Sequence, residues 1–154
     1  MNAYSLILSI ATAIRDEKLE VILVGNAAAA LRGAPVTTDD FDFMFRPTPR
    51  NLDKMARVAQ ALGATVSQPE YPISRFYRIS NLEVGLLIDM MGRLDGVKSF
   101  ESLRSRAEEI FFGDVSLKVA DLRDVIKSKR AARRPKDLAT LPVLEETLLL
   151  STKK

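Results

Sequence analysis

A short apolar run that meets a glycine and then an alanine-rich segment constrains the fold of this chain more than any other feature. Residues 19–24 (LEVILV) are rich in β-branched side chains, and their number fits a buried strand. Gly25 follows at once, and residues 26–31 (NAAAAL) have high helix propensity until Gly33 and Pro35 end the segment. A strand that passes directly into a helix predicts a fold that mixes both kinds of element.

The rest of the chain alternates between the same two patterns. Apolar spacing and cap residues predict helices over 3–16, 49–62, 99–106, 121–133 and 135–150. Strand-like runs occupy 40–45, 73–79, 83–90, 109–112 and 115–119. This order predicts an α+β fold, with a mixed β-sheet flanked by helices and two C-terminal helices. No repeat and no linker divides the 154 residues, so we expect a single domain over 1–154.

Two absences limit the chemistry that the chain can perform. There is no cysteine and no histidine, which excludes disulfides, thiolate metal sites, Ser-His-Asp triads and histidine bases. Any reaction must therefore use carboxylates, lysine, arginine, hydroxyls or a metal held by oxygen. No apolar run reaches the roughly 18 residues of a membrane span, and no signal peptide is evident, so we expect a cytoplasmic protein without a membrane segment.

Three acidic residues stand where strands are predicted. Asp40 and Asp42 are two positions apart, which places both side chains on one strand face, about 7 Å apart along the chain. Asp89 ends an otherwise apolar run. If the two strands are neighbours, the three carboxylates form a site for Mg²⁺, which prefers oxygen ligands. The alternative interpretation is that Asp39, Asp40 and Asp42 are solvent-facing charges at a strand end and Asp89 begins a turn.

Gly25 lies at a strand-to-helix junction, about 15 residues before the acidic pair. The free amides and the dipole of a helix N-terminus favour an anion, and a glycine lets a phosphate approach the backbone. A glycine at such a turn can also serve backbone conformation alone.

Basic residues gather in the C-terminal third of the chain. Seven of them, against one acid, lie between positions 123 and 136. Lys127, Arg130 and Arg134 recur at helical spacing, so they predict one stripe that guides an RNA strand, or else an ordinary solvated helix face.

A second set of basic residues is interleaved with aromatic ones. Arg75 and Arg78 alternate with Phe76 and Tyr77, a mixture that suits nucleic acid, although an exposed strand with core-facing rings is the favoured interpretation. Arg32 is expected either near phosphate or in a pair with a carboxylate.

The order of these motifs resembles the nucleotidyltransferase superfamily. The resemblance is carried by Gly25-Asn26, by 31–33 (LRG), by 38–42 (TDDFD) and by the later strand acid Asp89. The segments 121–132 (DLRDVIKSKRAA) and 134–138 (RPKDL) are similar to those of small stand-alone bacterial nucleotidyltransferases, including abortive-infection-type toxins of toxin–antitoxin pairs. The resemblance covers roughly residues 21 to 144.

The resemblance implies a reaction and its participants. Two Mg²⁺ ions, or Mn²⁺, would assist transfer of a nucleotide from an NTP such as ATP to a hydroxyl. The acceptor would be an RNA (tRNA-like), a protein or another macromolecule, and the chain would have a cognate toxin or antitoxin as partner.

The resemblance also implies roles for eight residues. Asp40 and Asp42 would hold both metal ions, and Asp89 would bind one of them and activate the acceptor hydroxyl. The nucleotide would be bound by the remaining five: Gly25, Asn26, Lys129, Arg134 and Asp137. Of these, Lys129 would take part in catalysis by neutralising phosphate charge, and Asp137 would orient the lysine or the nucleotide.

One departure from the family pattern keeps alternatives open. Asn26 stands where the family has Gly or Ser, and its bulk favours a second hypothesis, a non-catalytic nucleic-acid-binding module or antitoxin with the same fold. A third hypothesis is a partner protein that forms homodimers through Leu6, Ile10 and Ile14 of its first helix.

Overall fold

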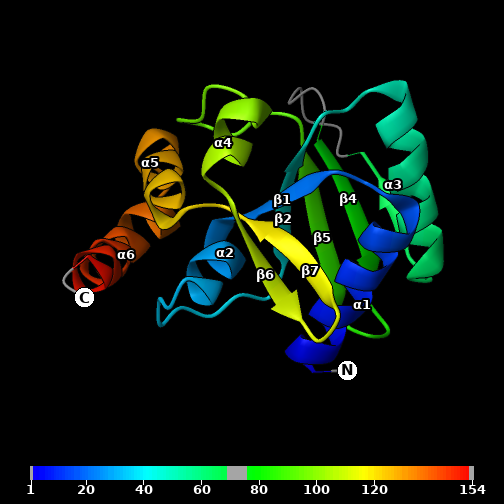
Figure 1. Cartoon of the computed structure of the whole chain (residues 1–154), viewed down its shortest axis with the longest axis horizontal. Coiled ribbons are helices and arrows are strands. Elements are labelled where there is room, and N and C mark those ends of the chain that lie inside the picture. Colours follow the sequence, from blue (N-terminus) through cyan, green and yellow to red (C-terminus); the bar gives the residue numbers. More distant parts are fainter. Residues whose placement is uncertain (1, 69–75, 153–154) are drawn as a thin grey trace.

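One mixed sheet organises the molecule in a computed structural model, which describes residues 2–68 and 76–152. Within these residues the sheet has seven strands (Figure 1). In chain order they are β1 Val21–Val24, β2 Phe41–Phe45, β3 Thr65–Ser67, β4 Phe76–Asn81, β5 Leu86–Met91, β6 Glu108–Phe112 and β7 Val115–Val119.

The strands lie in the order β3-β4-β5-β2-β1-β7-β6. The pairs β2–β5 and β1–β7 are parallel, whereas β1–β2 and the outer pairs β3–β4, β4–β5 and β6–β7 are antiparallel. The prediction of a mixed sheet is confirmed. Because β2 lies between β1 and β5, the motif that contains Asp42 sits near the middle of the sheet.

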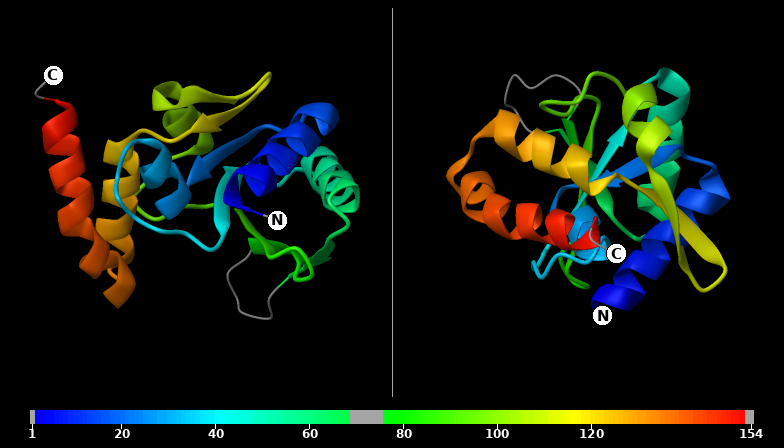
Figure 2. Two further views of the ribbon diagram at one scale, coloured as in Figure 1. Left: turned by 90° about the horizontal axis from the view of Figure 1, so that it is seen from below. Right: turned by 60° about the vertical axis from the view of Figure 1, so that its left-hand side comes forward.

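Six helices surround this sheet within the described residues. They are α1 Ala3–Glu17, α2 Gly25–Leu31, α3 Pro49–Ala61, α4 Phe100–Arg106, α5 Leu122–Ala132 and α6 Pro135–Ser151. Side-chain oxygens of Thr48, Ser99 and Asp121 accept hydrogen bonds from backbone amides at the starts of α3, α4 and α5, as N-cap residues do. Helices α1 and α3 lie together at one side, and α5 and α6 run antiparallel at the other (Figures 1 and 2).

The apolar face of β2 anchors the core. Phe43 and Phe45 are fully buried, and Phe41 is nearly so. They alternate with Asp42, which lies on the opposite face, so the predicted acid/aromatic alternation is present in the structure. Burial of each such ring contributes about 1.5–3 kcal/mol, which fixes the register of β2 and with it the face on which Asp42 lies.

The elements differ from the sequence prediction in a few places. Strand β3 was not expected, because its three residues are all exposed and show no apolar alternation. The turn between β4 and β5 occupies 82–85 rather than 80–82, since β4 continues through Asn81. Asp40 immediately precedes β2 instead of beginning it. The predicted start of the β4 strand at Ile73, and Arg75 with it, lie outside the described residues.

Among the helices of the described residues, none has the length and the apolar character needed to cross a membrane.

Candidate active site

Backbone register brings three polar side chains into one row across the sheet. Arg78 of β4 is the partner of Asp89 on β5, Asp89 is the partner of Asp42 on β2, and Asp42 is the partner of Val24 on β1. Neighbouring partners in a sheet point to the same face. The row therefore places Arg78, Asp89 and Asp42 side by side, and it ends one residue before Gly25.

Three carboxylates converge at this row. One oxygen each from Asp40, Asp42 and Asp89 lies within 4.8 Å of the others. Asp89 is buried, whereas Asp40 and Asp42 are half-buried, and the neighbouring Asp39 is exposed and outside the group. The pattern of strand positions therefore located residues that the fold does bring together.

Gly25 makes room for this group. Its φ of 67° lies in the left-handed region, which favours glycine. A Cβ atom added to Gly25 would lie 2.7 Å from Oδ2 of Asp42, too close for a carbon–oxygen contact. The glycine thus serves both the turn from β1 into α2 and the close approach of the Asp42 carboxylate to the backbone.

The carboxylate group carries more negative charge than its protein surroundings balance. The pKa of Asp42 is raised to about 7, chiefly by burial and then by the negative charges of Asp40 and Asp89. The charges of Lys136 and Lys129 oppose this shift. A carboxyl group that still holds a proton near neutral pH marks a place where a cation would bind favourably.

Arg78 partly balances the charge of Asp89. Its Nε donates to Oδ1 of Asp89 at 2.8 Å, and its Nη2 donates to Oδ2 at 3.3 Å. The hydrogen bond to Asp89 and its negative charge raise the pKa of the Arg78 guanidinium. The sequence pattern does not connect Arg78 with Asp89, because Arg75 and Arg78 are equivalent in it and only the strand register distinguishes Arg78.

Lys129, Arg134 and Asp137 form a second polar group at the junction of α5 and α6. Asp137 is fully buried and receives hydrogen bonds from both Nε and the backbone N–H of Arg134, at 2.7 and 3.2 Å. The Nζ atom of Lys129 lies 3.5 Å from Oδ1 of Asp137. This group adjoins the carboxylates, since the charges of Lys129 and Arg134 both interact with Asp42.

The pKa values of this second group follow from its pairing. Burial works to raise the pKa of Asp137, but the hydrogen bonds and charges of Arg134 and Lys129 outweigh it, and the pKa is lowered. Burial lowers the pKa of Lys129, against the opposing charge of Asp137. The one negative charge of this group is therefore paired with two positive charges, which leaves the group with an excess of one positive charge.

Asn26 stands at the start of α2, beside the carboxylates. Its Oδ1 atom is buried and has no hydrogen-bond partner within 2–68 and 76–152. A buried polar atom without a partner is uncommon in folded proteins. The amide is thus available to a bound molecule, and the chain has a polar side chain where the Gly or Ser of the family pattern would stand.

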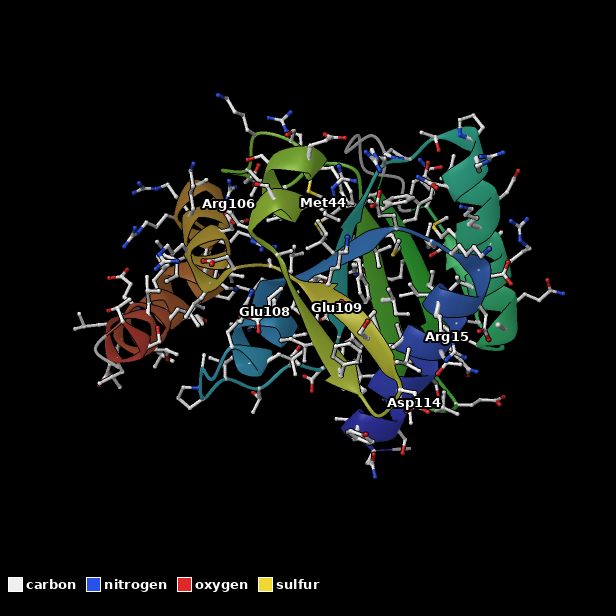
Figure 3. All side chains as sticks on the ribbon, in the orientation of Figure 1. Arg15, Met44, Arg106, Glu108, Glu109 and Asp114 are labelled. Carbon is white, nitrogen blue, oxygen red and sulfur yellow. The ribbon has the colours of Figure 1, made fainter. Side chains whose placement is uncertain are left out.

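Other basic residues predicted near the site have structural partners. Arg130 pairs with Glu145 of α6, and Arg32 pairs with Glu108 while its guanidinium also donates to the backbone oxygens of Val119 and Ala120 (Figure 3 labels Glu108). The predicted stripe of Lys127, Arg130 and Arg134 is wrong as a single helix face. Helix α5 ends at Ala132, Arg133 has a positive φ, and Arg134 caps the next helix.

The donor set of the carboxylate group fits a hard divalent cation. All three donors are carboxylate oxygens, which Mg²⁺ and Mn²⁺ prefer. Asp40, Asp42 and Asp89 could therefore hold such an ion, with Asn26 and Lys129 close by for an anionic ligand.

Comparisons with known proteins identify the fold. No family model and no curated protein matches the sequence. The solution structure of the antibiotic-resistance factor ANT(2'')-Ia matches with a TM-score of 0.64 at 17% identity, over 94% of this chain and 83% of that one. The crystal structure of ANT(2'')-Ia in complex with adenylyl-2''-tobramycin matches with a TM-score of 0.61 at 17% identity, over 97% and 95% of the two chains.

A third solved structure agrees with these two. TM1012 from Thermotoga maritima, a protein assigned as a nucleotidyltransferase, matches with a TM-score of 0.54 at 14% identity, over 97% of this chain and 92% of that one. The class that fold and topology define is therefore the nucleotidyltransferase fold, as the sequence resemblance predicted. At these identities the likeness concerns the fold, and the activity is argued from the site.

Proposed function

We propose that the chain is a nucleotidyltransferase that uses Mg²⁺ or Mn²⁺ to transfer a nucleotide from an NTP to an acceptor hydroxyl. The convergence of three carboxylate oxygens within 4.8 Å is the observation that carries this proposal. The raised pKa of Asp42 supports it, because the group lacks the positive charge that a bound cation would bring. The fold of ANT(2'')-Ia, seen with an adenylylated product, is consistent with the same class of reaction.

In the proposed reaction a bond forms between the acceptor oxygen and the α-phosphorus, and the bond from that phosphorus to the bridging oxygen breaks, releasing pyrophosphate. Asp40 and Asp42 would hold both metal ions, and Asp89 would hold one of them and accept the proton that the acceptor hydroxyl loses. Bound there, the ions would activate the attacking oxygen and neutralise the charge on the leaving group.

The remaining residues would hold the nucleotide. The absence of a side chain at Gly25 lets the Asp42 carboxylate lie close to the backbone, and Nδ2 of Asn26 would donate a hydrogen bond to the triphosphate. The Lys129 side chain is buried and is oriented by Asp137. It would neutralise phosphate charge on the nucleotide. Arg134 is held by Asp137 next to the carboxylate group and supplies a further positive charge to the nucleotide.

The charges around the site favour an acceptor that carries phosphates, which we infer to be RNA. A hollow of about 360 Å³ is lined by Arg93, Lys98 and Lys127, together with Asp95 and three other residues of the 94–97 loop. Its three basic side chains are exposed and form no ion pair in the part of the chain that the structure describes. Asp95 interacts with Arg134, which links the hollow to the carboxylate group.

This surplus of positive charge bears on the acceptor class. Tobramycin, the adenylylated acceptor in one ANT(2'')-Ia structure, carries several amines and is a polycation at neutral pH. A basic hollow disfavours such an acceptor and attracts a phosphate backbone, with an affinity that falls as salt rises. A toxin–antitoxin role remains part of this proposal on the resemblance of the C-terminal segment.

Transfer of label from an α-³²P NTP to cellular RNA in the presence of Mg²⁺ or Mn²⁺ tests the proposal. We expect labelled RNA with the wild type and none with Asp40→Ala. Asp39→Ala is the matched control, because Asp39 is adjacent and exposed but lies outside the carboxylate group. Label on tobramycin and not on RNA would overturn the acceptor class, and absence of label on every acceptor would overturn the activity.

A second candidate function is a non-catalytic nucleic-acid-binding module of the same fold. The pairing of Arg78 with both oxygens of Asp89 favours it, because a guanidinium can replace a metal ion as the charge partner. This candidate predicts RNA binding without NTP that survives Asp40→Ala. Binding that requires Mg²⁺ and NTP would exclude it.

A further inference from the structure

Arg78 and Asp89 form a two-point contact inside the carboxylate group. The Nε and Nη2 atoms of Arg78 donate to the two different oxygens of Asp89, at 2.8 and 3.3 Å. An ionised carboxylate has about four lone-pair sites, so this contact leaves others for a cation. A planar guanidinium bound at two points also fixes the plane of the carboxylate, which a single contact does not.

The same two-point contact occurs twice more within the described residues. Arg134 donates from Nε and Nη2 to the two oxygens of Asp137, at 2.7 and 3.3 Å, and the other instance lies away from the carboxylate group. Arg106 donates from Nε and Nη2 to the two oxygens of Asp124, at 2.8 and 3.0 Å, and ties the end of α4 to α5 (Figure 3). The exposed fractions of the side chains are closely matched, 43% and 10% for Arg78 and Asp89 against 45% and 7% for Arg106 and Asp124. The two pairs therefore differ chiefly in what surrounds them.

Of the pairs Arg78–Asp89 and Arg106–Asp124, only the first has further carboxylates beside it. Asp40 and Asp42 lie within reach of Asp89, and both interact with the charge of Arg78. Asp124 belongs to no such group among the described residues and lies in the first turn of α5. A guanidinium next to three converging carboxylates does more than connect two strands, because it competes with any cation that those carboxylates attract.

We propose that Arg78 is a positioning residue for nucleotidyl transfer: it holds the Asp89 carboxylate in the orientation required for catalysis and lowers the metal affinity of the site. This inference rests on the proposed function. The two-point contact of Arg78, here called the fork, prevents the Asp89 carboxylate from rotating away or from turning both oxygens toward one ion. Its positive charge repels the ion, so the gain in orientation is accompanied by weaker binding.

Two substitutions separate orientation from charge. Arg78→Gln removes the charge and the fork, so Mn²⁺ should bind roughly five- to tenfold more tightly, because a like charge a few ångströms away is gone. Its kcat should fall roughly 10–100-fold, the usual loss when a partner that orients a metal ligand is removed. Arg78→Lys keeps the charge but not the fork, so Mn²⁺ affinity should match the wild type while kcat recovers only in part.

The test measures Mn²⁺ binding to the nucleotide-free protein by electron paramagnetic resonance, together with kcat and Tm. Arg106→Gln is the matched control and should lower Tm while leaving Mn²⁺ affinity and kcat unchanged. If Arg78→Gln gives this control pattern, or binds Mn²⁺ more weakly than the wild type, the inference is overturned. Should Arg78→Gln fail to fold, Arg78→Lys decides, since wild-type kcat without the fork would also overturn it.

Failure of the proposed function and failure of the role of Arg78 give different results. A wild type that binds no Mn²⁺ and transfers no nucleotide contradicts the proposed function, and the role of Arg78 with it. A wild type that binds Mn²⁺ and transfers nucleotide, with Arg78 variants indistinguishable from it, contradicts only the role of Arg78.

Discussion

Two acidic residues in adjacent parts of the site have opposite electrostatic surroundings. Asp42, on the strand side, is half-buried among Asp40 and Asp89, and its pKa is raised to about 7. Asp137, on the helix side, is fully buried, yet its pKa is lowered because Arg134 and Lys129 bind it. The more deeply buried acid is thus the better satisfied one.

This difference shows that neighbouring charges, and not burial alone, decide whether the pKa of a carboxylate is raised or lowered. In the group formed by Lys129, Arg134 and Asp137, two positive charges surround the one buried carboxylate, which is therefore stable in its ionised form without a ligand. The group formed by Asp40, Asp42 and Asp89 has an excess of negative charge that Arg78 only partly offsets. We therefore expect substitution of the buried Asp137 to change mainly stability, and substitutions on the strand side to change mainly activity.

The largest effect is expected for Asp42→Asn. Loss of a carboxylate that binds both metal ions removes several kcal/mol of transition-state stabilisation, so label transfer should fall about a thousandfold or more. At pH 8 the same change should raise the free energy of unfolding by about 1–3 kcal/mol, because a poorly balanced buried charge is gone. Label-transfer assays and urea unfolding measure the two effects, with Asp39→Asn as control. An active or destabilised Asp42→Asn protein would contradict the comparison.

Asp137→Asn, in contrast, should have its main effect on stability. Removing one partner from a buried ion pair leaves Lys129 and Arg134 uncompensated, and the free energy of unfolding should fall by about 3–5 kcal/mol. Because the folded-state pKa of Asp137 is lowered, its contribution is present above the unfolded-state pKa and is lost as the pH falls through the folded-state value. Urea unfolding at neutral and acidic pH measures this effect.

The control for Asp137 is an ion pair in the same two helices. Glu145→Gln breaks the exposed contact with Arg130 and should change the free energy of unfolding by about 0–1 kcal/mol. Equal losses of unfolding free energy for Asp137→Asn and Glu145→Gln would mean that the buried group does not stabilise the packing of α5 and α6 more than an exposed ion pair does.

Gly25→Ala should perturb both stability and activity. An alanine with a positive φ costs about 1–2 kcal/mol, and its Cβ would also press on Oδ2 of Asp42. Gly113→Ala is the matched control, since Gly113 has a φ of 63° and nothing within 4 Å of an added Cβ. Both variants should lose similar stability, but only Gly25→Ala should lose label transfer. Equal transfer by the two would show that Asp42 tolerates the contact.

The smallest effect is a dependence of metal binding on pH. Since the pKa of Asp42 is raised to about 7, Mn²⁺ must displace a proton at pH 6, and its affinity should rise about tenfold from pH 6 to pH 8 and then level off. In the metal-free protein the folded state keeps this proton, so stability should fall as the pH rises from about 4 to 7. Asp42→Asn should show neither the rise in Mn²⁺ affinity nor the fall in stability with increasing pH. A wild-type protein that lacks both trends would contradict the raised pKa of Asp42.

The sequence was informative where alternation and buried strands determine a side chain's direction. Phe41, Phe43 and Phe45 fix the register of β2, so the direction of Asp42 follows from the pattern alone. Asp89 was recognisable as an acid in an apolar run. Their convergence depended on β2 and β5 being neighbours, which the pattern allowed but did not determine.

What the sequence did not predict depends on strand register and backbone dihedrals. The contact of Arg78 with Asp89 depends on register between β4 and β5, and nothing in the pattern distinguishes one arginine of that strand from another. The predicted basic stripe assumed that helical spacing continues past residue 132, whereas the left-handed conformation of Arg133 redirects the chain and lets Arg134 bind Asp137. Strand β3 lacks an apolar face and so gave no signal.

Anomalous diffraction from crystals soaked in Mn²⁺ and a non-hydrolysable NTP tests the central claim most directly. We predict a Mn²⁺ peak about 2.0–2.2 Å from carboxylate oxygens of Asp40, Asp42 and Asp89. A fully occupied Mn²⁺ site elsewhere, with these three side chains left without an ion, would contradict the account.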